Sequence, residues 1–364
     1  MQDLTADAVD RAIDRAPDRR AVDRALERAL VLAARGPAHG PNPQVGCVLI
    51  DTTGTVVGEG WHRGAGTRHA EAAALASADP VRLRGATAVV TLEPCHHSGR
   101  TPPCSVALRD AGVARVVYAC ADPNPVAAGG ATWLARHGVE VRTGAGAGAA
   151  PHLRDRADRL LEPWAAPWTL GRSWVTGKIA TTLDGRVAAA DGTSQWITGA
   201  AARAHAHTVR SAVDAIVAGT GTVLSDDPAL TARRADGSHH ERQPVRVVVG
   251  RRAVPPDAAV RRGPGAWRHA ATHDLAAVLD ELGSEGARRV LLEGGPTLLG
   301  AALRAGLVDE LHAYLAPVLL GAGTPAVPDL DIATLAQAQR WHTHETHRLG
   351  EDVLVVARRP ERKC

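Results

Sequence analysis

The stretch TLEPCHHSGRTPPC, from Thr91 to Cys104, contains two cysteines, two histidines and three prolines within fourteen residues. It follows an apolar, strand-like segment that starts at Ala86, and Cys104 itself opens a segment with helical spacing. Upstream, the tripeptide HAE, from His69 to Glu71, opens another helical segment. Residues that can bind a metal therefore stand at strand and helix ends, which predicts a metal site built into an α/β domain.

Three of these residues form a ligand set for zinc. His69, Cys95 and Cys104 supply one imidazole and two thiolates, and the fourth tetrahedral position stays open for water, as in catalytic zinc sites. Glu71 stands two residues from His69 and can reach that water without binding the metal. Zinc lowers the pKa of the water, and a glutamate can accept its proton and return it to a leaving amine. The pattern predicts hydrolytic deamination of an aminopyrimidine-type ring, since H-x-E followed by P-C-x-x-C is the signature of zinc deaminases.

The spacing of the two cysteines departs from that signature, because eight residues separate them instead of two. A structural zinc site or a redox pair is the alternative, but neither requires a glutamate at the position of Glu71. His96 or His97 could replace a cysteine as a ligand. Since two thiolates and His69 already complete the set, we expect a substrate-binding role for one of the two histidines, and we assign it to His97.

Composition limits the class of protein. The chain has 364 residues, 45% of them hydrophobic, which exceeds the usual size of one domain. The formal net charge is +3 and the arginines are scattered among nearly as many acidic residues, so a nucleic-acid partner is not indicated. No apolar run approaches a membrane span, and the acidic N-terminus is unlike a signal peptide, so we expect a cytoplasmic protein. Five cysteines are an odd number, which argues against a disulfide framework and favours metal binding or core packing.

Hydrophobic patterning divides the chain into four parts. We expect a flexible N-terminal extension over residues 1–20 and a three-layer α/β/α domain over 21–148. Residues 149–171 are interpreted as a linker whose helical part could still pack on the first domain, and 172–364 form a second α/β domain. The expected strands lie at 45–51 and 55–60, as a hairpin, and at 86–92, 115–120, 138–142, 174–180, 215–219, 245–250, 289–293, 310–315 and 352–358.

Two residues of rare types stand out in this composition. Asn42 lies between two prolines, whose fixed backbone can present its amide rigidly, although an ordinary turn is the alternative. Lys178 is the only lysine before the C-terminal tail and falls in an expected strand. A buried ammonium there suits hydrogen bonding or proton donation to a sugar oxygen, although a solvated edge lysine is the alternative. Glycine turns that follow strands near 219–222 and 292–296 predict a nucleotide or phosphate pocket in the same domain.

The first domain resembles the N-terminal domain of the bifunctional deaminase/reductase family of riboflavin biosynthesis. PNPQVG from Pro41, HAE from His69, TLEPCHHSGRTPPC from Thr91 and DPNP from Asp122 match that family in order and spacing, including the long insert between the cysteines. The resemblance implies a cytidine-deaminase-like fold that binds one zinc ion. It also implies that the substrate is a 2,5-diamino-6-ribosylamino-pyrimidinone 5′-phosphate whose ring amine is exchanged for oxygen, with Asn42 and His97 among its contacts.

The second domain resembles the reductase domain of the same family, in KIATTLDG from Lys178, SQWIT from Ser194, GTVLSDDPALT from Gly221 and LEGGP from Leu292. The resemblance implies a dihydrofolate-reductase-like α/β fold that uses NADPH to open and reduce the ribosylamino group to a ribitylamino group. It implies NADPH contacts by Ala180, Trp196, Thr222, Asp226 and Gly295. It implies substrate contacts by Ser194, Arg210, Leu230, Arg233 and Glu293, with the two arginines suited to clamping a phosphate through paired N–H donors. Lys178 and Asp184 are the candidates for the catalytic step.

Two segments depart from the family pattern. Residues 126–130 lack the lysine usual in that glycine turn and are one residue short, and residues 159–168 lack the usual Asn and Phe, so that Trp164 or Trp168 fills the space. Two other classes of protein are alternatives. A nucleic-acid base deaminase would need a basic, aromatic-lined groove, and only 3% of the chain is aromatic. A non-catalytic protein that uses zinc only for folding would not need Glu71. We expect a small-molecule pyrimidine ribotide as substrate, no nucleic-acid or membrane partner, and a homo-oligomer, either a dimer or a tetramer.

Overall fold

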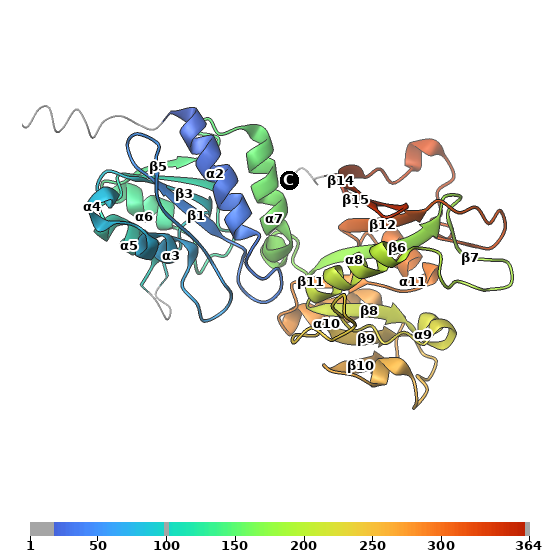
Figure 1. Ribbon diagram of the computed structural model, residues 1–364. Coiled ribbons are helices and arrows are strands. Elements are labelled where there is room, and N and C mark those ends of the chain that lie inside the picture. Colours follow the sequence, from blue (N-terminus) through green and yellow to red (C-terminus); the bar gives the residue numbers. More distant parts are fainter. Residues whose placement is uncertain (1–17, 98–101, 361–364) are drawn as a thin grey trace, which may run out of the picture. The chain divides into compact units, whose positions relative to one another are not determined.

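The computed structural model of the chain describes residues 18–97 and 102–360. The chain divides into two compact units, residues 1–169 and 170–364, and each is a sheet with helices on both faces (Figure 1). The expected N-terminal extension lies outside the described residues except for residues 18–20. There Asp18 caps the first described helix by accepting a hydrogen bond from the backbone N–H of Ala21 at 2.7 Å. No helix of the described residues is long and apolar enough to cross a membrane.

The first unit has a five-stranded sheet in the order β2-β1-β3-β4-β5. β1 pairs antiparallel with β2 and β3, whereas β3, β4 and β5 are parallel. Its elements are α2 (Arg19–Ala33), β1 (Gly46–Ile50), β2 (Val56–Trp61), α3 (Ala70–Ser77), α4 (Pro80–Leu83), β3 (Thr87–Leu92), α5 (Cys104–Asp110), β4 (Arg115–Cys120), α6 (Gly130–Arg136), β5 (Glu140–Thr143) and α7 (Pro151–Thr169).

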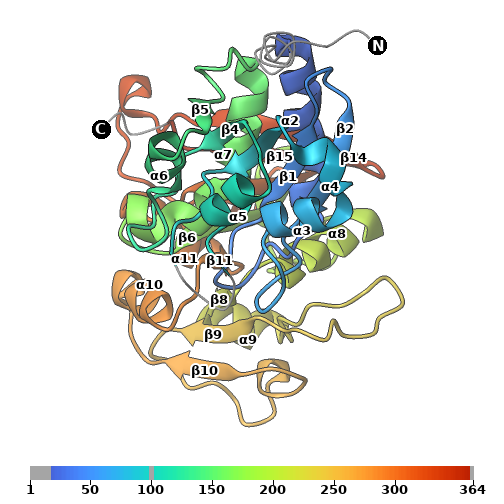
Figure 2. The same ribbon diagram turned by 90° about the vertical axis from the view of Figure 1, so that its left-hand side faces the viewer.

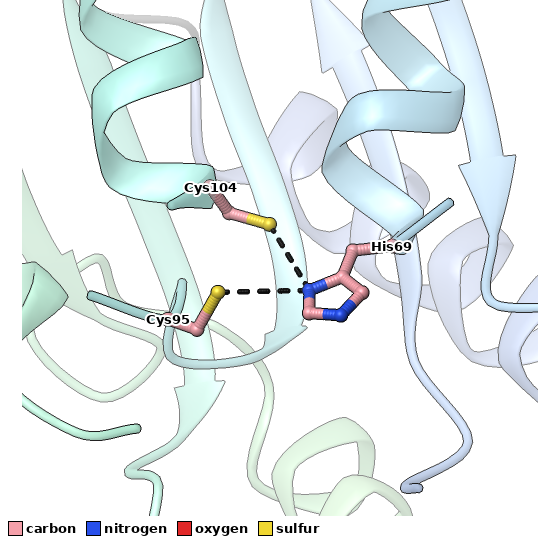
Figure 3. A group of neighbouring side chains, drawn as sticks. All are labelled: His69, Cys95 and Cys104. Carbon is pink, nitrogen blue, oxygen red and sulfur yellow. Dashed lines mark hydrogen bonds between the residues drawn. The ribbon is translucent and has the colours of Figure 1, made fainter. Parts of the chain in front are cut away.

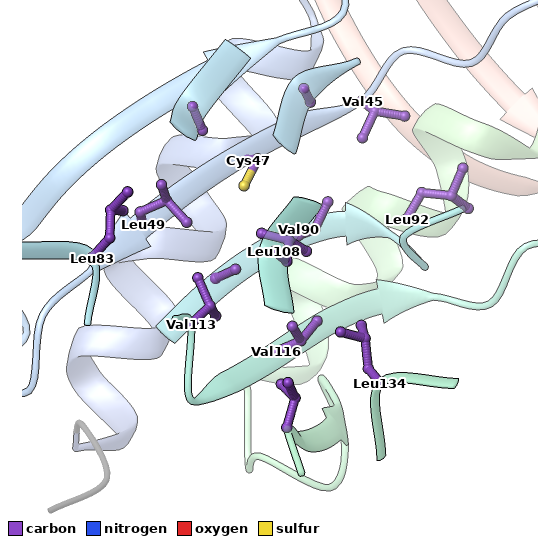
Figure 4. Close-up of a cluster of buried hydrophobic side chains, with 14 of the residues drawn as sticks. Val45, Cys47, Leu49, Leu83, Val90, Leu92, Leu108, Val113, Val116 and Leu134 are labelled. Carbon is purple, nitrogen blue, oxygen red and sulfur yellow. The ribbon is translucent and has the colours of Figure 1, made fainter. Parts of the chain in front are cut away.

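Successive side chains of the central strands enter two separate cores, as the period of two in a strand requires. Val48 and Val89 pack with α2 and the first half of α7 on one face. Cys47, Leu49 and Val90 pack with α3, α5 and α6 on the other face (Figure 4). The expected three-layer α/β/α arrangement is confirmed, and Figure 2 shows the same sheet and helices from a second direction.

The range expected as a linker, 149–171, is largely helical. α7 spans 19 residues despite Pro163 and Pro167, and it belongs to the first unit. Its residues Leu161 and Trp164 are buried in the same core as the central strands. The helical part of this range was expected to be able to pack on the first domain, and the burial of apolar side chains along α7 offsets the backbone hydrogen bonds that the two prolines cannot donate.

The second unit has an eight-stranded sheet in the order β10-β9-β8-β11-β6-β12-β15-β14, and β13 and β7 form a separate pair. In this order, the neighbouring strands from β10 to β12 pair in parallel. β15 pairs antiparallel with both of its neighbours, β12 and β14. Its elements are β6 (Trp174–Thr182), β7 (Arg186–Ala188), α8 (Ala200–Ser211), β8 (Ala215–Gly219), α9 (Thr220–Asp226), β9 (Val245–Val249), η1 (Ala259–Arg261), β10 (Trp267–Ala270), α10 (Leu275–Ser284), β11 (Arg289–Leu292), α11 (Pro296–Arg304), β12 (Glu310–Ala316), β13 (Thr324–Pro325), η2 (Leu335–Gln337), β14 (His342–Leu349) and β15 (Asp352–Arg358).

All six strands expected in the second domain are present, and four others were not expected. β7, β10 and β13 are only two to four residues long. β14 has eight residues, HTHETHRL, but it is the last strand of the sheet and almost every side chain is exposed. An edge strand without a buried face has no alternation of apolar and polar residues, so the sequence carries no strand signal there.

Candidate functional site

The three residues predicted as metal ligands converge in the first unit from three different elements. His69 is the residue just before α3, Cys95 follows β3 by three residues, and Cys104 is the first residue of α5. The Nδ1 atom of His69 lies 3.5 Å from the Sγ of Cys95 and 3.4 Å from the Sγ of Cys104 (Figure 3). The two thiols are buried and the imidazole is half-buried.

This ligand set fits zinc. One nitrogen and two sulfurs that share a tetrahedral zinc ion stand about 3.5 Å apart across each N–Zn–S angle, given Zn–N and Zn–S bonds of about 2.0 and 2.3 Å. The two measured sulfur to nitrogen distances agree with that spacing. A hydrogen bond from Cys104 also lowers the pKa of the Cys95 thiol to about 4, so the pair holds a thiolate, the form of cysteine that binds metal.

Glu71 lies beside this group in the first turn of α3, with only 4% of its surface exposed. Burial and, to a smaller extent, the negative charge of Cys95 together raise the pKa of its carboxyl to about 7. A carboxyl with a pKa near neutrality can both accept and donate a proton, which is the property required of a general acid and base.

Asn42 is held next to the metal-binding group by His62, a residue that the sequence did not indicate. The His62 ring packs edge-on against His69 with 5.6 Å between the ring centroids. Nδ1 of His62 is 3.1 Å from the carbonyl oxygen of Arg68, and Nε2 is 2.9 Å from Nδ2 of Asn42. Because a carbonyl can only accept, Nδ1 of His62 carries the proton and Nε2 accepts one from the Asn42 amide. Burial lowers the pKa of His62, in agreement with a neutral ring.

The two histidines of the motif differ in their contacts. The His96 ring pairs with the hydroxyl of Ser105 at 2.9 Å and stacks on Trp133 at 5.0 Å, so it connects two helices of the domain. The Nδ1 atom of His97 is buried and finds no hydrogen-bond partner among the described residues. Of the two, only His97 has a buried ring nitrogen that lacks a partner among the described residues.

Glu93 is a further residue that the sequence analysis did not single out. It is buried, and its carboxylate accepts hydrogen bonds from the backbone N–H groups of Asp122, Gly129 and Ala131 at 3.0 to 3.3 Å. Gly129 has φ +99°, and a Cβ atom on Gly130 would lie 1.8 Å from the carbonyl oxygen of Pro94. The shortened glycine turn thus packs directly against the residue before Cys95, and Glu93 holds it there.

The second unit contains a cavity of about 1190 Å³ near the carboxyl ends of its parallel strands. Among its lining residues are all of the predicted contacts of this unit: Lys178, Ala180, Ser194, Trp196, Arg210, Thr222, Asp226, Leu230, Arg233, Glu293 and Gly295. These residues come from segments more than 100 positions apart, and the fold brings them to one site.

A buried group of charges stands in the wall of this cavity. Arg210 donates through Nε and Nη2 to the two carboxylate oxygens of Glu293, at 2.7 and 2.6 Å, and Lys178 Nζ lies 3.4 Å from Glu293 Oε1. Lys178 is on β6, a central strand between β11 and β12, so the alternative of a solvated edge lysine is wrong. The paired donors of Arg210 that were expected to clamp a phosphate point instead to Glu293 in this structure.

Two of the predicted cofactor contacts, Thr222 and Gly295, lie where two glycine turns meet. Gly295, which precedes α11, donates its N–H to the hydroxyl of Thr222 on α9 at 2.7 Å. Asp226 accepts a hydrogen bond from Ser194 at 3.3 Å. Trp196 is 70% exposed, with the guanidinium of Arg203 4.5 Å from its ring centroid. The strands β8 and β11 that lead into these turns are parallel neighbours, an arrangement that commonly forms a ligand crevice.

Three further predicted residues have different surroundings. Arg233 is exposed toward the cavity and forms no ion pair with the described residues. Leu230 is buried in the left-handed region at φ +52°, so only its backbone is suited to a polar contact. Asp184 does not line the cavity. Its carboxylate accepts hydrogen bonds from the hydroxyl of Thr182 and from the backbone N–H groups of Leu320 and Gly321, so it connects two turns. These contacts give it a structural role and remove the basis for a catalytic one.

Comparison with known protein families finds one match within each of the two units. Residues 20–120 match the cytidine and deoxycytidylate deaminase zinc-binding region, and residues 173–355 match the RibD C-terminal domain. The riboflavin biosynthesis protein RibD of Mycobacterium tuberculosis is 48% identical over 315 residues, which cover 86% of this chain and 90% of that protein. RibD of Escherichia coli is 39% identical over 351 residues, covering 86% and 93%.

Solved structures agree with the sequence comparisons. Acinetobacter baumannii RibD superimposes with a TM-score of 0.82 at 35% identity, over 94% of this chain and all of that one. A diaminohydroxyphosphoribosylaminopyrimidine deaminase/5-amino-6-(5-phosphoribosylamino)uracil reductase from Thermotoga maritima gives 0.79 at 30% identity, over 94% and 99%. These matches leave no support for a nucleic-acid deaminase or a non-catalytic zinc protein. The chain belongs to the RibD family of riboflavin biosynthesis and is a bifunctional enzyme, with a zinc-dependent deaminase followed by an NADPH-dependent reductase.

Proposed function

We propose that the first unit deaminates a diaminopyrimidinone ribotide and that the second unit then reduces its ribosyl side chain to a ribityl chain. The observation that carries this proposal is the grouping of His69, Cys95 and Cys104 around a buried Glu71 in one unit, while the other unit has a separate charged cavity. The relative from Thermotoga maritima bears both activities in its name, which supports the same pair of substrates here.

In the first unit, His69, Cys95 and Cys104 would hold the zinc ion. When bound, zinc supplies a Lewis acid that lowers the pKa of a water molecule at the open ligand position. Glu71 accepts the proton of the attacking water and delivers it to the amine that leaves the ring, for which a pKa of about 7 is suited. Asn42 and His97 contact the substrate. The Asn42 amide turns its NH₂ group to His62, which leaves its Oδ1 atom for a ligand, and Nδ1 of His97 has no partner among the described residues.

In the second unit, Thr222, Asp226, Gly295, Ala180 and Trp196 would contact NADPH, which when bound supplies the hydride for the sugar carbon. The sugar oxygen released by ring opening needs a proton. Glu293 cannot give it: burial alone would raise its pKa, but Arg210 and Lys178 overcome that effect and hold the pKa at about 2. Burial also lowers the pKa of the neighbouring His207 to about 4, so that ring is neutral near pH 7. Lys178 is the remaining cation beside Glu293 that can donate a proton.

The substrate phosphate needs a positive partner that is not already paired. Arg233 meets this requirement, since it faces the cavity and forms no ion pair with the described residues. Arg210 instead acts through Glu293, and Glu293, Ser194 and the backbone of Leu230, which line the same cavity, contact the substrate. This division of roles replaces the pair of phosphate-binding arginines expected from the sequence.

The Glu71→Gln variant tests this proposal, with ammonia release, zinc content and NADPH oxidation as the three measurements. We expect ammonia release to fall about a hundredfold to ten-thousandfold, because the proton carrier is removed. Zinc should stay bound, and NADPH oxidation should persist when the deaminated ribotide is supplied. The matched control is Glu59→Gln, a surface glutamate paired with Arg28, which should change neither step. If the variant loses both its zinc and its ammonia release, Glu71 is a zinc ligand and not the general acid and base.

The compartment and the oligomeric state are part of the same proposal. Cys47, Cys95, Cys104 and Cys120 are free thiols in the described part of the chain, as a reducing compartment such as the cytoplasm would keep them. We expect a homodimer or homotetramer, since closed symmetry favours even numbers of subunits. Light scattering of the purified protein tests this, and a monomeric mass would contradict it.

A further inference from the structure

The helix that ends the first unit reaches the turn that carries Asn42. The indole Nε1 of Trp164, on α7, donates a hydrogen bond to the carbonyl oxygen of Pro41 at 3.0 Å, across 123 residues of sequence. Trp164 is 6% exposed and packs in the core that also contains Val45 and Leu92. The indole is therefore fixed by its own packing, and it ties the residue before Asn42 to the body of the unit.

A second tie acts on the side chain of Asn42. His62, whose Nδ1 faces the carbonyl of Arg68, presents an accepting Nε2 to the Asn42 amide at 2.9 Å. The amide group therefore has only one orientation, with its NH₂ toward His62. Its oxygen Oδ1 has no hydrogen-bond partner among the described residues, so it is the acceptor that Asn42 can offer to an N–H group of a ligand.

Further along the turn, the buried side chain of Gln44 donates to the carbonyl of Gly36 at 2.8 Å. The turn formed by residues 36–44 is thus held at three points. Gln44 bonds to Gly36 within the turn, His62 holds Asn42, and Trp164 holds Pro41. Pro41 itself is exposed. If the indole N–H were absent, the Pro41 carbonyl could turn to water, and the turn would move without a large loss of folding free energy.

We propose that Trp164 is a positioning residue for deamination, because its indole N–H fixes the Pro41 turn and so the Asn42 oxygen at the place where the substrate ring binds. The inference rests on the proposed role of Asn42 as a substrate contact. It extends the deaminase site to α7, beyond the 20–120 region that the deaminase family model matches.

Steady-state ammonia release by the full-length, zinc-loaded Trp164→Phe variant is the first test. Phenylalanine keeps an aromatic ring in the core but has no N–H. We expect the KM for the ribotide to rise about tenfold while kcat changes less than about twofold, since a misplaced contact weakens binding more than chemistry when Glu71 is untouched. Zinc content should be unchanged, and so should NADPH oxidation when the deaminated ribotide is supplied. The control is Trp168→Phe, on the same helix and packed against the same core, which should leave KM unchanged.

A double-mutant cycle separates positioning from a general structural effect. In the Asn42→Ala background, Trp164→Phe should change KM by less than about twofold, because the group that it positions is gone. An unchanged KM in Trp164→Phe alone, an equal rise of KM in both backgrounds, or loss of zinc from Trp164→Phe would each overturn the inference. If the unaltered chain releases no ammonia, the proposed function itself fails and the inference falls with it.

Discussion

The guanidinium of Arg210 and the carboxylate of Glu293 form a two-point hydrogen-bonded ion pair, at 2.7 and 2.6 Å, inside the wall of the reductase cavity. Both side chains are nearly buried, with exposed fractions of 13% and 11%, and Lys178 adds a second cation to the same carboxylate. A buried charge that loses its partner is costly, so this pair links the stability of the second unit to the placement of Lys178.

Replacement of Glu293 by glutamine should therefore destabilise the second unit. Arg210 and Lys178 would face each other without a compensating charge, and the expected loss is about 3–5 kcal/mol of unfolding free energy, together with most of the NADPH oxidation. Chemical unfolding of the full chain measures this. The transition of the second unit is recognised because added NADPH shifts its midpoint.

The control for this prediction is Glu285→Gln. Glu285 pairs with Arg268 at 2.7 Å, but both groups are more exposed, so the loss should stay below about 1 kcal/mol. If Glu293→Gln and Glu285→Gln lower the unfolding free energy equally, the buried ion pair contributes no more to stability than the exposed one.

The same carboxylate gives the second unit a pH-dependent stability. Burial would raise the pKa of Glu293, but Arg210 and Lys178 hold it at about 2, below the ordinary value of 4.5. A group whose pKa is lowered by folding stabilises the folded state above its unfolded pKa, and this stabilisation disappears as the pH falls through the folded pKa. Between about pH 4.5 and pH 2 the unfolding free energy should drop by about 2–3 kcal/mol more in the unaltered chain than in Glu293→Gln. Parallel pH curves for the two proteins would contradict the assignment.

Removal of one thiolate should separate the two activities. Cys104→Ser should lower zinc content and abolish ammonia release, because serine is a poor zinc ligand and two protein ligands hold the metal weakly. NADPH oxidation with the deaminated ribotide should continue. The control is Cys120→Ser, since Cys120 is a thiol on β4 that donates to Asp158 at 3.0 Å and is not part of the metal-binding group. A Cys104→Ser protein that keeps its full zinc content would remove Cys104 from the ligand set.

The glycine turn after the first unit's fourth strand should not tolerate a side chain. In Gly130→Ala the added Cβ would meet the Pro94 carbonyl at 1.8 Å, so Pro94 and with it Cys95 must move. We expect a loss of about 1–3 kcal/mol in stability and faster loss of zinc to a chelator. Gly144→Ala is the matched control, because its Cβ would find only ordinary contacts at 3.5 Å or more. Equal zinc retention by the two variants would show that the turn is not part of the metal site's support.

Local motifs carried most of what the sequence could predict. His69, Glu71, Cys95 and Cys104 stand at the ends of strongly patterned strands and helices, so the order of elements was enough to bring them together. Contacts between side chains that are far apart in the sequence could not be predicted in this way. Nothing near Arg210 indicates that Glu293, 83 residues later, takes its paired donors, and so Arg210 was expected to bind the phosphate together with Arg233.

The helix α7 shows a second limit of sequence reasoning. The low-complexity segment before it favoured a linker whose helical part could still pack on the first domain, and the structure shows that its apolar side chains are buried in that unit. Trp164 was expected only to fill space, and its hydrogen bond to Pro41 depends on the packing of the whole helix. His62 and Glu93 were missed because single buried polar residues in a sequence give no sign of their partners.

The most direct test of the central claim is ammonia release in the absence of NADPH, measured together with zinc content on the purified full-length chain and the diaminopyrimidinone ribotide. The account predicts one zinc ion per chain, one ammonia per ribotide without NADPH, and oxidation of NADPH only after that step. Bound zinc without ammonia release, or ammonia release that requires NADPH, would contradict an independent zinc deaminase in the first unit.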